Sequence, residues 1–163
     1  MKTASQILML MAVISFMSCG QLHVVTLYVD TSQVEKSNTD QYAHFGQPKG
    51  ISNKDFTIYV RKGDRVIWNA VSTSNSADVV NITSIINKSG VDKQNKPFVN
   101  FFKAKYSNPD YTMSQSSTRD IKGIVRRAIK KGKPGDIQKY SLTFTINDMK
   151  KEIEVDPKMQ MFY

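Results

Sequence analysis

Apolar and polar side chains alternate on both sides of a turn in the segment Phe56–Trp68. Phe56–Val60 has the period of two that predicts a half-buried strand. Lys62-Gly63-Asp64 follows with turn chemistry, because Gly tolerates a positive φ and Asp can hydrogen-bond backbone nearby. Val66 and Trp68 then restart the alternation. The segment therefore predicts either a β-hairpin or a unit that crosses between sheets, with the only tryptophan pointing into the core.

The same short alternating or β-branched runs recur along the chain, separated by Gly-, Pro-, Asn- and Ser-rich breaks. Counting gives about eight strands, which is typical of an antiparallel sandwich or barrel. We predict an all-β protein: a single antiparallel β-sandwich of Greek-key type, with room for one short helix. The predicted strands are Leu22–Asp30, Lys54–Arg61, Arg65–Val71, Asp78–Asn87, Pro97–Phe102, Asp120–Lys131, Tyr140–Ile146 and Lys151–Val155.

Asp120–Lys131 is the ambiguous element among these. Its apolar residues have helical spacing, with Lys and Arg covering the other face. Read as a strand, the same run alternates imperfectly through Ile121, Gly123 and Val125. Periodicity alone favours a short basic helix, whereas the β-rich surroundings favour a strand. We expect a strand and leave the helix open.

The N-terminus has the pattern of an export signal. Lys2 precedes Ile7–Met17, an apolar run of 11 residues, which is too short to span a bilayer but suits a signal peptide. We expect residues 1–19 to be a signal peptide and residues 20–163 to form one domain. We therefore expect an exported protein that is either periplasmic or anchored to the outer membrane. Free secretion is a less favoured alternative.

The only cysteine, Cys19, lies at the end of this run. Residues 16–19 resemble the lipobox of bacterial lipoproteins, although Phe16 stands where an aliphatic residue is usual. Cys19 would then be acylated and would tether the protein to a membrane. The alternative is ordinary cleavage after Gly20, with Cys19 lost. A single cysteine excludes an intramolecular disulfide on either reading.

The chain carries a formal net charge of +9, which favours contact with anionic surfaces. The basic run 122–133 is the candidate binding surface for an anionic partner, and a simple solvated face is the alternative. No nucleic-acid motif is present, so no nucleic-acid partner is expected. The candidate residues are Lys122, Arg126, Arg127, Lys130, Lys131 and Lys133.

Three segments resemble known families. Lys62–Trp68 is similar to the KGD-hydrophobic-x-W strand of cupredoxin-like domains. Lys133–Asp136 with Tyr140–Phe144 resembles their PG-x-Y-x-F segment. Val155–Met159 looks like the closing DPK segment of the bacterial inclusion-body protein family (AidA/PixA type), which also has a Ser/Asn-rich loop like that in Ser72–Ile86.

The resemblance implies a β-sandwich and no more, and we predict separately that residues in and near these motifs are structural anchors. Blue copper needs two His, one Cys and usually a Met. His23 and His44 are the only histidines, and the segment after Tyr140 offers only Met149. We therefore expect no copper and no other cofactor. The anchors are Gly63, Asp64, Trp68, Gly135, Tyr140, Asp156 and Pro157.

Catalytic chemistry has little support in the sequence. No G-x-S-x-G motif is present, and His44 is interpreted as a loop or core-edge histidine with a backbone partner. Glu152 and Glu154 share a strand face beside lysines, which favours a solvated face over an acid/base pair. An aromatic sugar-binding platform is conceivable, with core packing as the commoner alternative; its members would be Tyr59, Trp68 and Tyr140.

These observations favour a non-enzymatic exported binding module for a glycan or another anionic component of the cell envelope. The alternative is a structural or assembly protein that self-associates or pairs strands with a partner. The sequence leaves the ligand and the oligomeric state open.

Overall fold

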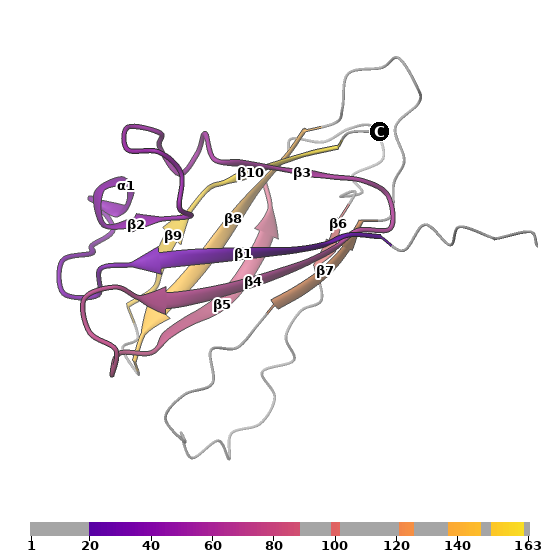
Figure 1. Ribbon diagram of the computed structural model, residues 1–163. Helices are drawn as coiled ribbons and strands as arrows, with labels where there is room; N and C mark the ends of the chain where they lie inside the picture. Colours follow the sequence, from indigo (N-terminus) through magenta and orange to yellow (C-terminus); the bar gives the residue numbers. More distant parts are fainter. Residues whose placement is uncertain (1–19, 89–98, 102–120, 126–136, 148–150, 162–163) are drawn as a thin grey trace, which may run out of the picture.

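The computed structural model describes residues 20–88, 99–101, 121–125, 137–147 and 151–161, and it has an all-β fold with one short helix there (Figure 1). The predicted all-β class is confirmed. The helix is α1 (Thr39–Tyr42). The strands are β1 (Leu22–Val29), β2 (Ala43–His44), β3 (Thr57–Val60), β4 (Arg65–Ser72), β5 (Val80–Asn87), β6 (Val99–Phe101), β7 (Ile121–Val125), β8 (Ile137–Ile146), β9 (Ile153–Val155) and β10 (Lys158–Met161).

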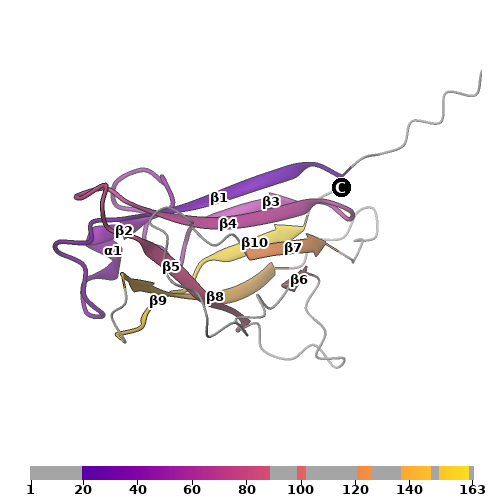
Figure 2. The ribbon, with the colours of Figure 1, turned by 90° about the horizontal axis from the view of Figure 1, so that it is seen from below.

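The strands form two sheets that pack face to face (Figures 1 and 2). The first sheet has the order β2-β1-β4-β7-β6, and the second has the order β3-β10-β8-β5, with β9 also paired to β8. The largest buried side chains come from both sheets and include Trp68 and Leu27 from the first and Tyr140 and Phe144 from the second. The core therefore lies between the sheets.

The strand pairing corrects the expectation of a purely antiparallel sandwich, because both sheets are mixed. β1 and β4 run parallel from the pair Leu22↔Arg65 to the pair Val29↔Ser72. β3 and β10 are also parallel. Parallel neighbours need a long crossover connection, and β2, α1 and β3 lie in the chain between β1 and β4. Hydrophobic alternation identifies strands but carries no information about their partners.

The segment Phe56–Trp68 crosses from one sheet to the other. β3 belongs to the second sheet and β4 to the first, so the crossing unit is confirmed and the hairpin is wrong. Gly63 lies in the connecting turn with φ of 92°, a conformation that glycine adopts without strain. Asp64 follows it and is buried.

The ambiguous segment is a strand where the structure describes it. β7 buries Ile121, Gly123 and Val125 and exposes Lys122 and Ile124. β7 pairs with β4 and β6. This pairing with strands from other parts of the chain makes the segment a strand, and periodicity alone cannot show it. The short helix instead lies at α1, outside every predicted strand. Two further strands, β2 and β10, were not among those predicted.

Candidate functional site

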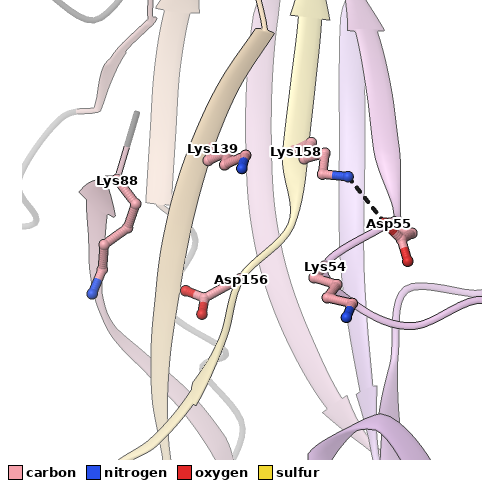
Figure 3. Close-up of a pocket in the computed structure, with 6 residues that line it drawn as sticks. All are labelled: Lys54, Asp55, Lys88, Lys139, Asp156 and Lys158. Carbon is pink, nitrogen blue, oxygen red and sulfur yellow. Dashed lines mark hydrogen bonds and ion pairs between the residues drawn. The ribbon is translucent and has the colours of Figure 1, made fainter. Parts of the chain in front are cut away.

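A pocket of about 310 Å³ lies where the second sheet meets the loops before β3 and after β9. Four lysines and two aspartates line it, drawn as sticks in Figure 3. The lysines come from four places in the chain and give the lining an excess of two positive charges. The lining residues are Lys54, Asp55, Lys88, Lys139, Asp156 and Lys158. We call this the lysine pocket.

Strand register brings three of these lysines into one row. Lys139 of β8 and Lys158 of β10 are direct cross-strand partners. Lys88, just after β5, donates its backbone N–H to the carbonyl of Lys139 at 2.8 Å. Like charges at directly opposed positions oppose strand pairing. The row is therefore an arrangement that an anionic ligand would stabilise.

Carboxylates offset part of this charge. Lys158 Nζ lies 3.0 Å from Asp55 Oδ1, and Lys88 Nζ lies 3.2 Å from Glu154 Oε1. The bond from the Ser52 hydroxyl and the contact with Lys158 lower the pKa of Asp55, which keeps it ionised. Exposed pairs of this kind contribute little to stability because solvent screens them, so a ligand could replace them at small cost.

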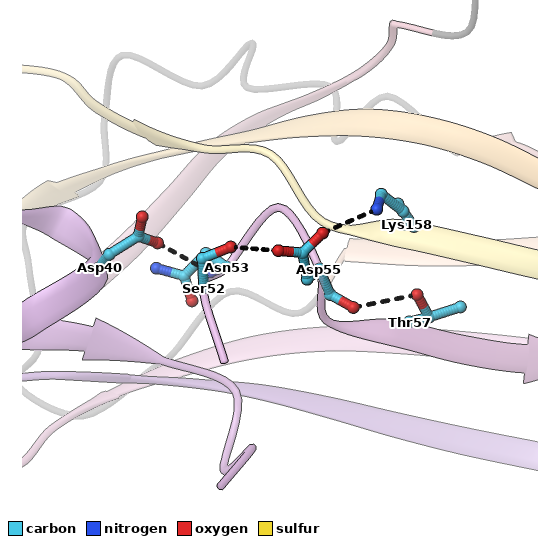
Figure 4. A network of polar contacts seen from close by, with 6 residues as sticks. All are labelled: Asp40, Ser52, Asn53, Asp55, Thr57 and Lys158. Atoms are coloured by element: carbon cyan, nitrogen blue, oxygen red, sulfur yellow. Dashed lines mark hydrogen bonds and ion pairs between the residues drawn. The ribbon is translucent and has the colours of Figure 1, made fainter. Parts of the chain in front are cut away.

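A hydrogen-bond network fixes the loop before β3 beside the pocket (Figure 4). Buried Asn53 donates its backbone N–H to Asp40 Oδ1 at 2.7 Å and its side-chain amide to the Ala43 carbonyl at 2.8 Å. Ser52 donates its hydroxyl to Asp55 Oδ2 at 2.8 Å. The backbone N–H of Lys158 bonds the Phe56 carbonyl at 2.9 Å. The Asp55–Lys158 side of the pocket is thereby held in place by hydrogen bonds from both side chains and backbone.

The lysine pocket presents mainly hydrogen-bond donors. Its ammonium groups have no acceptor capacity, and the described residues that line it are all Lys or Asp. Within the described residues, no group of three or more His, Cys, Asp or Glu is arranged to hold a metal. The described part of the chain also contains no helix that is long and apolar enough to cross a membrane.

The aromatic sugar platform is not formed. Trp68 and Tyr140 are fully buried, whereas Tyr59 is 56 % exposed. The Trp68 indole N–H donates to the Tyr140 hydroxyl at 3.0 Å, and the rings meet edge to face with centroids 5.8 Å apart. Burial raises the pKa of Tyr140 far above its usual value, even though the bond from Trp68 lowers it. These two residues are core anchors that join the sheets.

Asp64 is a buried anchor that accepts hydrogen bonds from more groups than its predicted role in a turn requires. Its Oδ1 accepts the Gln21 N–H at 2.8 Å, and its Oδ2 accepts the Arg61 N–H at 2.7 Å and lies 2.8 Å from His23 Nε2. Burial raises the pKa of Asp64, but the bonds from Arg61, His23 and Gln21 outweigh this effect and lower it. The predicted turn aspartate thus also fastens the start of β1.

Of the other predicted residues that the structure describes, only Asp156 lines the lysine pocket. His44 is exposed, stacks on Tyr28 with centroids 5.4 Å apart, and accepts the Gly46 N–H at its Nδ1. Pro157 is buried between β9 and β10.

Lys122 of the basic run is exposed on β7, in the first sheet. Several predicted residues lie outside the described ones: Cys19, Arg126, Arg127, Lys130, Lys131, Lys133 and Gly135.

Sequence reasoning missed the lysine pocket because its members are scattered. Lys88 follows β5, Lys139 lies within β8 and Lys158 begins β10, in three separate parts of the chain. Only the pairing of β10 with β8, and of β8 with β5, brings them together. The sequence contains only a weak indication of the pocket. Lys139 directly precedes the predicted strand Tyr140–Ile146, and Lys158 directly follows Pro157.

Comparison with known proteins shows a similarity of fold. No family model matches the sequence. The search of curated proteins finds no match either. A crystal structure of the inclusion body protein PixA from Burkholderia cenocepacia J2315 is similar, with a TM-score of 0.50 and 12 % identity, over 91 % of this chain and all of that one. The resemblance to the inclusion-body family is thus supported at the level of fold, and it does not extend to cupredoxin features.

Proposed function

We propose that the protein is a non-catalytic binding module for an anionic glycan or another anionic component of the cell envelope, and that the lysine pocket is its ligand site. The observation that carries this proposal is the row of Lys88, Lys139 and Lys158 across neighbouring strands. Three ammonium groups in one row suit a ligand with several phosphates or carboxylates, because each is a compact charge with movable donors. The network around Asn53 supports this role by fixing one wall of the pocket before a ligand arrives.

Calorimetric titration of the full chain with three polymers tests the proposal: lipopolysaccharide, polygalacturonate and neutral dextran. We expect binding to one or both anionic polymers and none to dextran. The variant Lys88→Gln/Lys139→Gln/Lys158→Gln should bind at least about tenfold more weakly, because each of the three lost charge pairs contributes roughly 0.5–1 kcal/mol. Absence of binding to both polyanions would overturn the proposal.

Attachment to a membrane through Cys19 is part of the same proposal. A Cβ placed on Gly20 would lie 1.8 Å from the Gly63 carbonyl oxygen, so Gly20 packs against the turn as only glycine can. Cleavage before Cys19 would keep this contact in the mature protein, whereas cleavage after Gly20 would remove it. Mass spectrometry of the mature N-terminus separates these outcomes: acylated Cys19 supports tethering, and an N-terminal Gln21 excludes it.

A second candidate is an assembly role through strand pairing. Exposed strand edges can pair with another chain, and the similar Burkholderia protein is called an inclusion body protein. Light scattering distinguishes this role, because a monomer at all concentrations would contradict it and concentration-dependent growth would support it.

A further inference from the structure

The outer face of the first sheet carries exposed apolar side chains near the start of β1. Leu22 and Val24 are 47 % and 58 % exposed, and Ile124 of β7 is 37 % exposed. Their neighbours on the inner face, such as Val25 and Leu27, are buried in the core. An exposed apolar group of this kind on a soluble domain marks an interaction surface when its members are contiguous.

Strand register makes these residues contiguous and places cations among them. One row across the sheet consists of Leu22, Arg65 and Ile124, and the adjacent row consists of Val24, Ile67 and Lys122. Arg65 and Lys122 are exposed and Ile67 is half-buried. We call these six residues the β1–β4–β7 patch.

Carboxylates are missing from this face over the described strands. The remaining outward positions of β1 and β4 are Thr26, Tyr28, Asn69 and Val71. The patch therefore combines four aliphatic side chains with two cations and no described acidic neighbour on the same face of β1, β4 or β7. The lysine pocket lies on the other sheet, so the two surfaces are separate.

We infer that the β1–β4–β7 patch docks on an anionic lipid bilayer. Aliphatic side chains enter the boundary between headgroups and acyl chains, while Lys and Arg extend their stems and keep their charges at the headgroups. Each basic residue near an anionic membrane surface adds to the attraction. β1 begins three residues after Cys19, so acylation there would bring this end of the sheet to the bilayer.

Other occupants fit the patch less well. In a two-fold symmetric dimer, the same face of both chains would form the interface. Arg65 and Lys122 would then face the cations of the second copy, and no described carboxylate on that face would neutralise them. A soluble polyanion would satisfy the cations but would leave Leu22 and Val24 in water. A bilayer with anionic headgroups satisfies both kinds of side chain at once.

Tryptophan quenching by brominated lipids tests this inference on the full chain. Val24→Trp places a fluorophore on the patch, and Ile86→Trp places a matched one on β5 of the other sheet, where Ile86 is 53 % exposed. Trp68 is fully buried and gives a constant background. With vesicles of brominated phosphatidylglycerol and phosphatidylcholine, we expect at least about twofold stronger quenching for Val24→Trp than for Ile86→Trp.

Both variants share residues 1–19, so any binding through that segment affects them equally. If vesicles that contain only brominated phosphatidylcholine quench Val24→Trp less than the mixed anionic vesicles do, this result supports the role of the two cations. Equal quenching at the two positions, or none in Val24→Trp, would overturn the inference. So would a lipid-free dimer seen by sedimentation that Val24→Asp dissociates, because a second copy would then occupy the patch.

Discussion

His23 Nε2 lies 2.8 Å from Asp64 Oδ2, and this contact joins the first strand to the turn that carries the chain between the sheets. Both residues are largely shielded from solvent, with side-chain exposures of 17 % and 4 %. The parallel pairing of β1 with β4 brings them together, because His23 is the register partner of Val66. The start of β1 is thus anchored by a side chain 41 residues away in the sequence.

Asp64→Asn should destabilise the fold although it preserves size and shape. An amide presents one oxygen where the carboxylate presents two, and its NH₂ group would face a backbone N–H or His23. We expect a loss of about 1–3 kcal/mol in the free energy of unfolding, measured by urea denaturation. His44→Asn, at an exposed histidine, is the control and should change this value by less than about 0.5 kcal/mol. Equal effects for the two variants would contradict the anchoring role.

Acid should lower the free energy of unfolding, partly through protonation of Asp64. Its pKa is lower in the folded chain than the ordinary value of 3.8, so the folded state binds this proton less readily than the unfolded state. The stabilisation is complete above the unfolded pKa and is lost as the pH falls through the folded pKa. Between about pH 5 and pH 2.5, the wild type should therefore lose more stability than Asp64→Asn. Parallel losses in urea denaturation would show that other carboxylates account for the acid sensitivity.

Trp68 and Tyr140 should behave as a core pair that links the two sheets. Trp68→Ala is expected to cost about 3–5 kcal/mol, because it removes a fully buried large side chain. Tyr140→Phe keeps the ring but removes the acceptor of the indole bond, and it should cost about 1 kcal/mol. Denaturation monitored by circular dichroism measures both values. A change below about 1 kcal/mol for Trp68→Ala would disprove the anchor.

Binding in the lysine pocket should depend strongly on salt. Screening acts over about 10 Å at 0.1 M salt and about 3 Å at 1 M, so contacts between lysines and a polyanion weaken as salt rises. We expect the affinity for lipopolysaccharide or polygalacturonate to fall by at least about tenfold between these concentrations. Titrations at the two salt concentrations provide the measurement. An unchanged Kd would mean that apolar contacts, rather than the lysines, hold the ligand.

Much of the fold could be predicted from local patterns, but the site could not. Alternation in segments such as Tyr140–Ile146 identified strands, and the turn chemistry of Gly63 was correct. Strand partners are set by long-range packing, so the parallel pairs could not be predicted, and the choice between a hairpin and a sheet crossing at Phe56–Trp68 stayed open. The same limit hid the contact of His23 with Asp64 and the row formed by Lys88, Lys139 and Lys158. The aromatic residues could be placed on strands, and the predicted core position of Trp68 is confirmed.

The most direct test of the lysine pocket is a comparison of three variants that each remove three positive charges. Lys88→Gln/Lys139→Gln/Lys158→Gln changes the pocket, and Lys36→Gln/Lys49→Gln/Lys62→Gln changes exposed lysines elsewhere. Lys130→Gln/Lys131→Gln/Lys133→Gln changes the basic run proposed from the sequence. The measurement is the Kd of each variant for the polyanion that the wild type binds. Our account predicts that the pocket variant alone weakens binding by about tenfold or more; equal weakening in all three, or in the basic run alone, would contradict it.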